Sequence, residues 1–403
     1  MFRLLALMPL FWLLSPESLR RLGNLAAYGT SGALFLISLG LISLAAFRAV
    51  RNWPGITGCE GGETIQAAPP QSTPGLILEF AAILGTTLFG STGMLVTAGY
   101  TFNEVFYYRF PNFGFAALLL VVLCFLALLS ARLMRLTGSV LLLIVLVCLA
   151  ILTLTGLLSL DQASVAVRDP LPLKLPGLLV GLMLFVGVEQ TAAISRQVPA
   201  VQVYPIYLVT LIVLAGWLFV ASRFVAEDRL AFSSIGHMQA AFQVLGQPGR
   251  LLMGLAVICG CCGAVGLLLD KSLQLFAQML RRPVESLFSR ATVIVLGGAL
   301  GAALMFGLAG SERLEILIRG SLVLWLFYSG FLLLTSISCH RLFSPRSWLA
   351  PVCAMIYLAG SIYLVAVDPD LPLLAIFLTG WLVSSALCII VSDAVTRGRI
   401  GPG

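Results

Sequence analysis

A glycine-spaced apolar run near the middle of the chain decides the fold class. Residues 177–194 read GLLVGLMLFVGVEQTAAI, and Glu189 is the one charged side chain among them. A helix needs about 20 mostly apolar residues to cross the hydrocarbon core of a bilayer, and this run with its flanks supplies them. Because a charge at that depth costs free energy, Glu189 is a candidate functional residue. The alternative is an ordinary helix whose single Glu is bonded to a neighbouring helix.

Comparable apolar blocks fill the rest of the chain. Of the 403 residues, 60% are apolar and 10% are charged. A soluble domain carries about 25% charged residues, so a soluble enzyme, a nucleic-acid-binding protein and a disordered chain are all excluded. Residues 4–15 form a short candidate helix, and with it the sequence predicts an all-α polytopic membrane protein with 11–12 transmembrane helices. The eleven longer segments are 25–47, 76–101, 113–134, 138–160, 175–195, 204–224, 250–270, 290–309, 315–337, 348–367 and 371–392.

The loop charges predict the orientation and the compartment. The formal net charge is +7, and Lys and Arg gather in alternate loops, as they do on the cytoplasmic side of membrane proteins. The expected partner is therefore the lipid bilayer and not nucleic acid. Short loops and the lack of a transit peptide suit a bacterial inner membrane. The predicted organisation is one domain over residues 1–403, and 235–246 is expected to be a short helix on the membrane surface. The domain comprises an atypical N-terminal segment (1–24), a transmembrane bundle (25–392) and a cytoplasmic tail (393–403).

Four further charged residues are candidates for gating or ion coupling. Glu79 lies about one turn inside its span, where it either extends to the cytoplasmic interface or serves transport. Arg319 lies four residues after Glu315, so the two form either a structural helix pair or an outward-facing gate that attracts a carboxylate. Asp270 and Lys271 are adjacent in sequence and so point to different sides of a helix, where we expect each to meet other partners at the cytoplasmic mouth.

Nothing in the sequence indicates an enzyme, a cofactor or a resident metal. The chain has two His, and it lacks phosphate-loop, metal-hydrolase and Ser-His-Asp signatures. Cys259, Cys261 and Cys262 are a possible soft-metal set, but small packing residues are the more common use of such cysteines.

Two stretches of the sequence share a weak pattern that indicates an internal repeat. The stretches from Gly93 to Pro111 and from Gly266 to Pro283 each run from a small-residue helix centre to a proline. They are five segments apart, which is the spacing of a five-plus-five inverted repeat.

Residues 177–210 resemble the sixth helix of amino-acid permeases of the amino acid–polyamine–organocation (APC) superfamily. The matching positions are Phe185, Gly187, Glu189, Pro199 and Pro205. Residues 270–290 and 312–343 are similar to the end of helix eight and to helix ten of that family.

The resemblance implies a LeuT-like fold of five plus five inverted helices, with helices one and six unwound at mid-membrane. It implies secondary active transport of amino acids or related amines by alternating access, with Glu189 as a polar gate or carrier of a coupling proton and Arg319 as an outer gate. The substrate would be lined by Phe185, Val186, Gly187, Val188 and Glu189.

The segment that corresponds to helix one of the family leaves an alternative function open. Residues 4–15 hold that place and contain no Gly, whereas the family has a glycine-rich unwound segment there. The alternative is a permease-like membrane subunit that no longer transports and instead anchors or assembles a partner protein.

Overall fold

The described part of the chain consists of helices joined by short turns. The computed structural model describes residues 22, 25–26, 28–51, 73–162, 181–187, 200–225, 230, 235–280, 287–305, 311–338 and 349–399. No β-strand occurs among these residues, which confirms the predicted all-α class. The physical reason is that lipid offers no hydrogen bonds, so a spanning backbone must satisfy its own polar groups within a helix.

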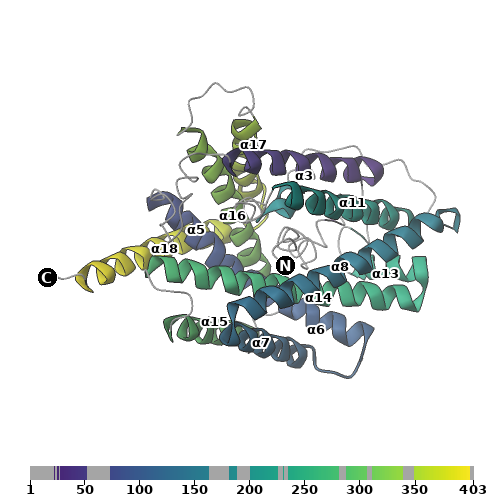
Figure 1. Cartoon of the computed structure of the whole chain (residues 1–403), viewed down its shortest axis with the longest axis horizontal. Coiled ribbons are helices and arrows are strands. Elements are labelled where there is room, and N and C mark those ends of the chain that lie inside the picture. Colours follow the sequence, from purple (N-terminus) through teal and green to yellow (C-terminus); the bar gives the residue numbers. More distant parts are fainter. Residues whose placement is uncertain are drawn as a thin grey trace. The chain divides into compact units, whose positions relative to one another are not determined.

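Twelve α-helices occur in the described residues, and most of them follow the apolar segments of the sequence (Figure 1). They are α3 (Gly29–Arg51), α5 (Thr73–Gly85), α6 (Ser91–Val105), α7 (Asn112–Leu129), α8 (Ala131–Leu158), α11 (Ala200–Phe224), α13 (Ile235–Leu245), α14 (Gln247–Met279), α15 (Leu287–Met305), α16 (Glu312–Ser338), α17 (Leu349–Ala366) and α18 (Leu371–Arg399). A π-turn, η2 (Thr86–Gly90), joins α5 to α6, and two 3₁₀ turns are η3 (Leu160–Gln162) and η4 (Leu182–Phe185).

The helix lengths support a multi-pass integral membrane protein. Within the described ranges, seven helices are long and apolar enough to cross a membrane, and three more are apolar but shorter. Residues 4–15 and most of 175–195 lie outside the described residues, so the predicted total of 11–12 spans stays a prediction.

One predicted boundary between two helices is wrong. The connection between the spans 113–134 and 138–160 lies at Ser130, where α7 has ended and α8 begins at once. The Ser130 hydroxyl accepts the Arg132 backbone N–H at 3.1 Å and so caps α8. Arg132 and Arg135 therefore belong to the first turns of α8. Hydropathy could not predict this start, because it carries no information on a capping side chain. The last helix also continues beyond residue 392, to Arg399.

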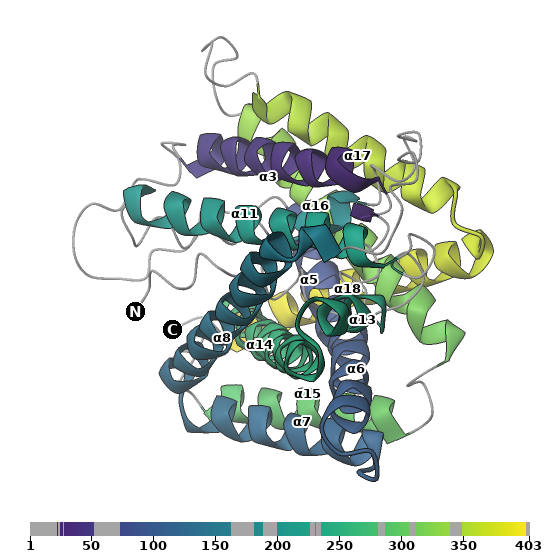
Figure 2. The ribbon, with the colours of Figure 1, turned by 90° about the vertical axis from the view of Figure 1, so that its right-hand side faces the viewer.

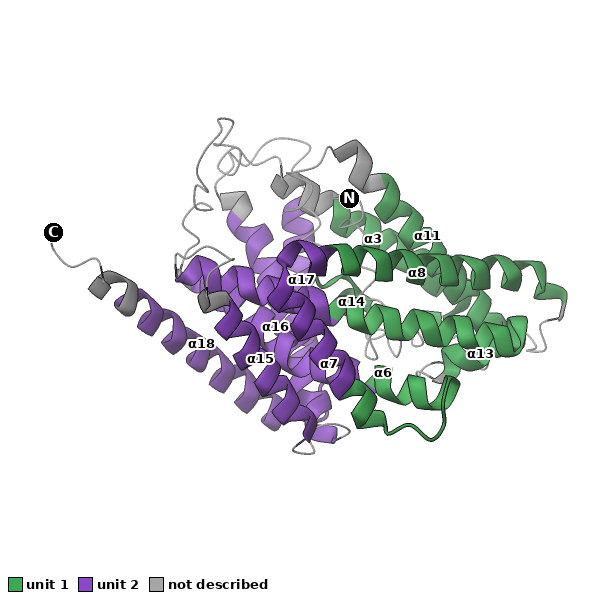
Figure 3. Ribbon diagram, turned by 60° about the horizontal axis from the view of Figure 1, so that its bottom comes forward, with its two compact units in different colours: residues 1–51, 97–116, 136–264 green, residues 52–96, 117–135, 265–403 purple. Residues whose placement is uncertain are grey.

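The chain folds into two compact units, each built from segments that are distant in the sequence (Figure 3). Unit 1 comprises residues 1–51, 97–116 and 136–264. Within it α3 and α11 lie side by side in both ribbon views (Figures 1 and 2). In the same unit, α11 also packs closely against α8. This close packing depends on a small residue, since a Cβ on Gly216 of α11 would come within 2.8 Å of the Thr153 methyl of α8.

Unit 2 comprises residues 52–96, 117–135 and 265–403. Here α16 packs against α5, α17 and α18. A Cβ on Gly85 of α5 would lie 2.9 Å from the Ser321 hydroxyl of α16, so the two backbones approach closely. From α18, the Trp381 indole N–H donates to the Ala81 carbonyl at 2.8 Å, which fixes that helix against α5.

Candidate functional site

The segment predicted to line the substrate breaks out of helical geometry. Gly181 has helical dihedral angles, η4 follows as a single 3₁₀ turn, and Val186 is extended with ψ of 129°. Gly187 has φ of +92°, a value that an L-residue rarely adopts. Phe185 and Val186 are 1% and 0% exposed, so the break is enclosed by protein. Buried or cavity-lining positions are where a membrane protein tolerates a non-helical backbone.

The break is held by α3 and α11 of the same unit. A Cβ on Gly40 of α3 would lie 2.9 Å from the Phe185 ring and 2.7 Å from a Leu211 methyl, so both side chains converge on that glycine. The buried Tyr207 hydroxyl donates to the Gly40 carbonyl at 3.4 Å. The surroundings of the break are thus mostly apolar with a few neutral polar groups, an arrangement typical of small-molecule sites.

Gly187→Ala tests the conformation of the break. Because the native φ is +92°, a Cβ there is expected to cost about 1–2 kcal/mol and to lower the melting temperature of the purified protein. Gly181→Ala is the matched control, since its φ is −61° and its Cβ would meet Leu25 and Phe35 at an ordinary 3.5 Å. Equal melting temperatures for the two variants would contradict the left-handed conformation of Gly187.

The remaining predicted lining residues, Val188 and Glu189, lie outside the described residues. Their roles therefore stay predictions from the sequence. Phe185 to Gly187 belong to unit 1, whereas Glu79, Asp270, Lys271 and Arg319 belong to unit 2.

Asp270 and Lys271 share one partner on α14. Gln274 donates through Nε2 to the Asp270 carboxylate at 2.8 Å, and its Oε1 accepts from Lys271 Nζ at 3.5 Å. Asp270 is 5% exposed, and Arg135 of α8 also brings positive charge toward it. A carboxylate buried among charged and amide groups is suited to gating, and its coupling role stays a prediction.

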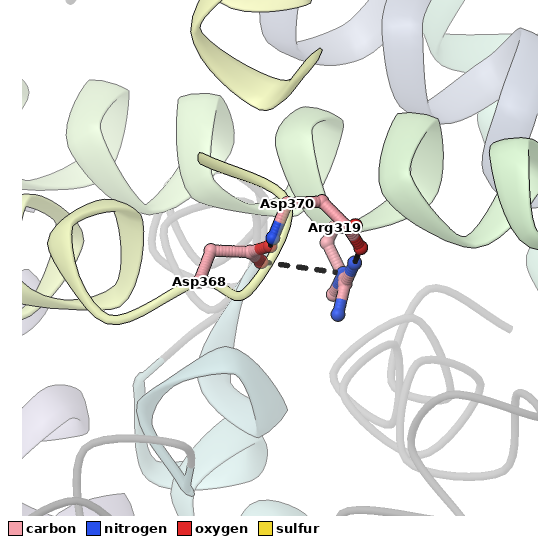
Figure 4. A network of polar contacts seen from close by, with 3 residues as sticks. All are labelled: Arg319, Asp368 and Asp370. Carbon is pink, nitrogen blue, oxygen red and sulfur yellow. Dashed lines mark hydrogen bonds and ion pairs between the residues drawn. The ribbon is translucent and has the colours of Figure 1, made fainter. Parts of the chain in front are cut away.

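Arg319 binds two carboxylates in the turn between α17 and α18 (Figure 4). Its Nη2 lies 2.9 Å from Asp370 Oδ2, and its Nε lies 3.4 Å from Asp368 Oδ2. The Asp368 side chain is 7% exposed and also accepts the Asp370 backbone N–H at 2.9 Å. The network thus holds the first turn of α18 to α16. Glu79, the last of the predicted residues, lies half-buried in the second turn of α5.

Sequence reasoning missed a polar centre in unit 2. The run TTLFGST (86–92) contains the π-turn η2, and π-turns inserted into α-helices are frequent at functional sites. Its four hydroxyl residues are each 0% exposed. The local signal was four hydroxyls in seven residues of a span. That signal is weak by itself, because Ser and Thr within a membrane helix usually bond to their own backbone.

Sequence comparisons give no relative. No known protein family matches the chain, and no curated protein is similar to it in sequence. The resemblance to amino-acid permeases therefore stays a prediction.

Structure comparison finds the fold. A histidine-to-alanine variant of the manganese transporter of Eremococcus coleocola matches with a TM-score of 0.61 and 12% identity, over 97% of this chain and 93% of that chain. The same transporter in complex with an aromatic bis-isothiourea substituted compound matches with a TM-score of 0.55 and 12% identity, over 98% and 94%. At this level of identity the likeness establishes a shared fold.

Proposed function

We propose that this protein is a secondary transporter that moves a small polar solute by alternating access. The observation that carries the proposal is the buried break at Val186 and Gly187, in a chain whose fold is shared with a membrane transporter over 97% of its length. Discontinuous helices near the bilayer midplane are where transporters hold substrate, because backbone groups freed there can bind it. No catalytic activity is part of the proposal, and the bacterial inner membrane is its expected location.

The proposed substrate is an amino acid or a related amine. Support comes from the permease-like pattern of residues 177–210 and from the neutral oxygens beside the break, such as the Gly40 carbonyl and the Tyr207 hydroxyl. Carbonyl and hydroxyl oxygens accept hydrogen bonds from an ammonium group. Glu189 would act as the gate or carry a coupling proton.

A divalent metal ion is the second candidate substrate. It is favoured by the manganese transporter whose structures share this fold. Against it, no three His, Cys, Asp or Glu side chains gather into a metal site within the described ranges. Neutral oxygens alone bind a divalent ion poorly, because carboxylates usually repay its dehydration.

Counterflow of labelled amino acids into proteoliposomes tests the proposal. We expect saturable exchange by the wild type and a loss of at least about tenfold for Glu189→Gln, since a gate or proton carrier needs its charge. Glu312→Gln in the exposed first turn of α16 is the matched control and should transport normally.

Two outcomes would count against the amino-acid proposal. Uptake of labelled manganese without amino-acid exchange would assign the metal ion as substrate. No exchange and no manganese uptake by folded protein would favour the non-transporting subunit, and co-purification from native membranes would then look for its partner.

A further inference from the structure

The π-turn η2 lies inside one continuous helical run that is long enough to span the membrane. The run from Pro74 to Val105 contains α5, η2 and α6. The Ser91 backbone N–H donates to the Thr86 carbonyl, five residues earlier, which is the bond that defines a π-turn. Such a turn costs backbone regularity, so its presence amid four buried hydroxyls calls for an explanation.

Ser91 differs from the other three hydroxyl residues of this run. The Thr86, Thr87 and Thr92 hydroxyls donate to the carbonyls four residues earlier, at 2.8, 2.7 and 2.7 Å. The Ser91 hydroxyl is fully buried and has no hydrogen-bond partner among the described residues. An unpartnered buried hydroxyl costs about 1–3 kcal/mol, which is a reason to expect that something else binds it.

Helix spacing places Ser91 on the face whose other residues contact α14. Phe80 packs edge-on against Phe276 at 5.5 Å, and the Thr87 hydroxyl lies 2.8 Å from the Ser272 hydroxyl. Ser91 follows Thr87 by four residues, close to one full π-turn, so it projects to the same side. The α14 side adds the Leu268 carbonyl, 3.4 Å from the Thr87 hydroxyl oxygen.

Around the Thr87 hydroxyl there are more oxygen atoms than hydroxyl protons that could bond to them. The Thr87 hydroxyl oxygen has three other oxygens within 3.5 Å, on Ile83, Leu268 and Ser272. Thr87 and Ser272 supply one hydroxyl proton each, and Thr87 can donate only once. Excess oxygen lone pairs in a water-poor interior favour a bound cation.

We propose that the hydroxyls of Thr87, Ser91 and Ser272, with the Leu268 carbonyl, bind a monovalent alkali cation. All of these oxygens are neutral, which suits an ion of single charge and not a divalent one. Asp270 lies about 200° around the α14 axis from Leu268, so it is on a different side of the helix from the proposed site. Its carboxylate is bound by Gln274. A role for this cation in driving transport rests on the proposed function, whereas its binding does not.

Equilibrium binding of radioactive sodium ion to purified full-length protein tests the site, with potassium and lithium as competitors and choline as the inert cation. For Ser91→Ala and Ser272→Ala we expect the Kd to rise at least about tenfold. Ser91→Thr retains the hydroxyl and should bind like the wild type. Ser361→Ala is the matched control, because Ser361 is a buried serine whose hydroxyl bonds to the Tyr357 carbonyl at 2.6 Å.

A melting experiment adds a signature that a merely structural serine would not give. In choline, Ser91→Ala should melt no lower than the wild type, because it loses an unsatisfied hydroxyl. In sodium, the wild type should gain stability and the variant should not, since a bound ion stabilises the folded state.

The proposal is overturned if the wild type binds none of the three alkali ions, or if Ser91→Ala binds them as tightly. The counterflow assay keeps the two proposals apart. Exchange without cation binding overturns the cation site alone. Cation binding that Ser91→Ala removes, without exchange, supports the site and counts against the transporter.

Discussion

Replacing Asp368 by asparagine is expected to lower the free energy of unfolding by on the order of 2–4 kcal/mol, between the values for a charge-assisted hydrogen bond and for a fully buried ion pair. The variant leaves the Arg319 guanidinium, which is only 24% exposed, without its more buried carboxylate. Asparagine keeps an oxygen for the Asp370 backbone N–H, so the turn bond survives and the charge alone is removed. Thermal or denaturant unfolding of the purified protein measures the loss.

The matched control is Asp370→Asn. The Asp370 carboxylate is nearer to Arg319, at 2.9 Å, but its side chain is 43% exposed, and solvent-exposed pairs contribute about 0.2–1 kcal/mol. Arg319→Lys should also lower the free energy of unfolding, although it keeps the positive charge. One ammonium group cannot bind both carboxylates as the planar guanidinium group does. A larger loss for Asp370→Asn than for Asp368→Asn would contradict this ranking by burial.

Replacing Gly320 by alanine is expected to cost about 1–3 kcal/mol, the usual penalty for overpacking. A Cβ on Gly320 of α16 would come within 2.5 Å of the Phe377 ring of α18. That ring cannot move aside freely, because it stacks on Trp381 at 6.0 Å and meets the edge of Phe89 at 5.5 Å. The loss should appear as a lower melting temperature.

Gly380→Ala on α18 is the control for this substitution. Nothing lies within 4 Å of its Cβ position, so alanine should stabilise the helix by about 0.5–1 kcal/mol. Adding Phe377→Leu to Gly320→Ala should recover part of the loss, since it removes the ring that clashes. A Gly320→Ala protein as stable as the wild type would show that α16 and α18 do not approach so closely.

Most of the described helices could be predicted because hydropathy is a local property. The apolar segments identify the helices, and predicted segments such as 315–337 and 348–367 agree closely with α16 and α17. The error lies where a boundary depends on one side chain, at Ser130. Hydropathy also does not show that α18 continues past its apolar span to Arg399. A pattern of apolar residues carries no information on a cap.

Less of the site could be predicted. The glycines and Glu189 made residues 177–194 a candidate site, and the structure shows a non-helical backbone there at Val186 and Gly187. For Arg319 the sequence suggested Glu315, four residues away, as a partner. It gave no sign of the two carboxylates that Arg319 also binds, at Asp368 and Asp370, which lie 49 and 51 positions along the chain. The π-turn at Thr86 leaves no mark in the hydropathy pattern, because threonine and serine are tolerated in any membrane helix.

The sequence by itself determined that this chain is an α-helical protein of the membrane, since lipid forces any long apolar run into a helix. It also showed which charged residues lie within or beside the apolar runs. Only the tertiary structure decided what those residues meet. The contacts of Thr87 with Ser272 and of Trp381 with Ala81 join positions 185 and 300 residues apart. Such pairs form when folded helices bring distant residues together, and no local pattern of residues encodes that.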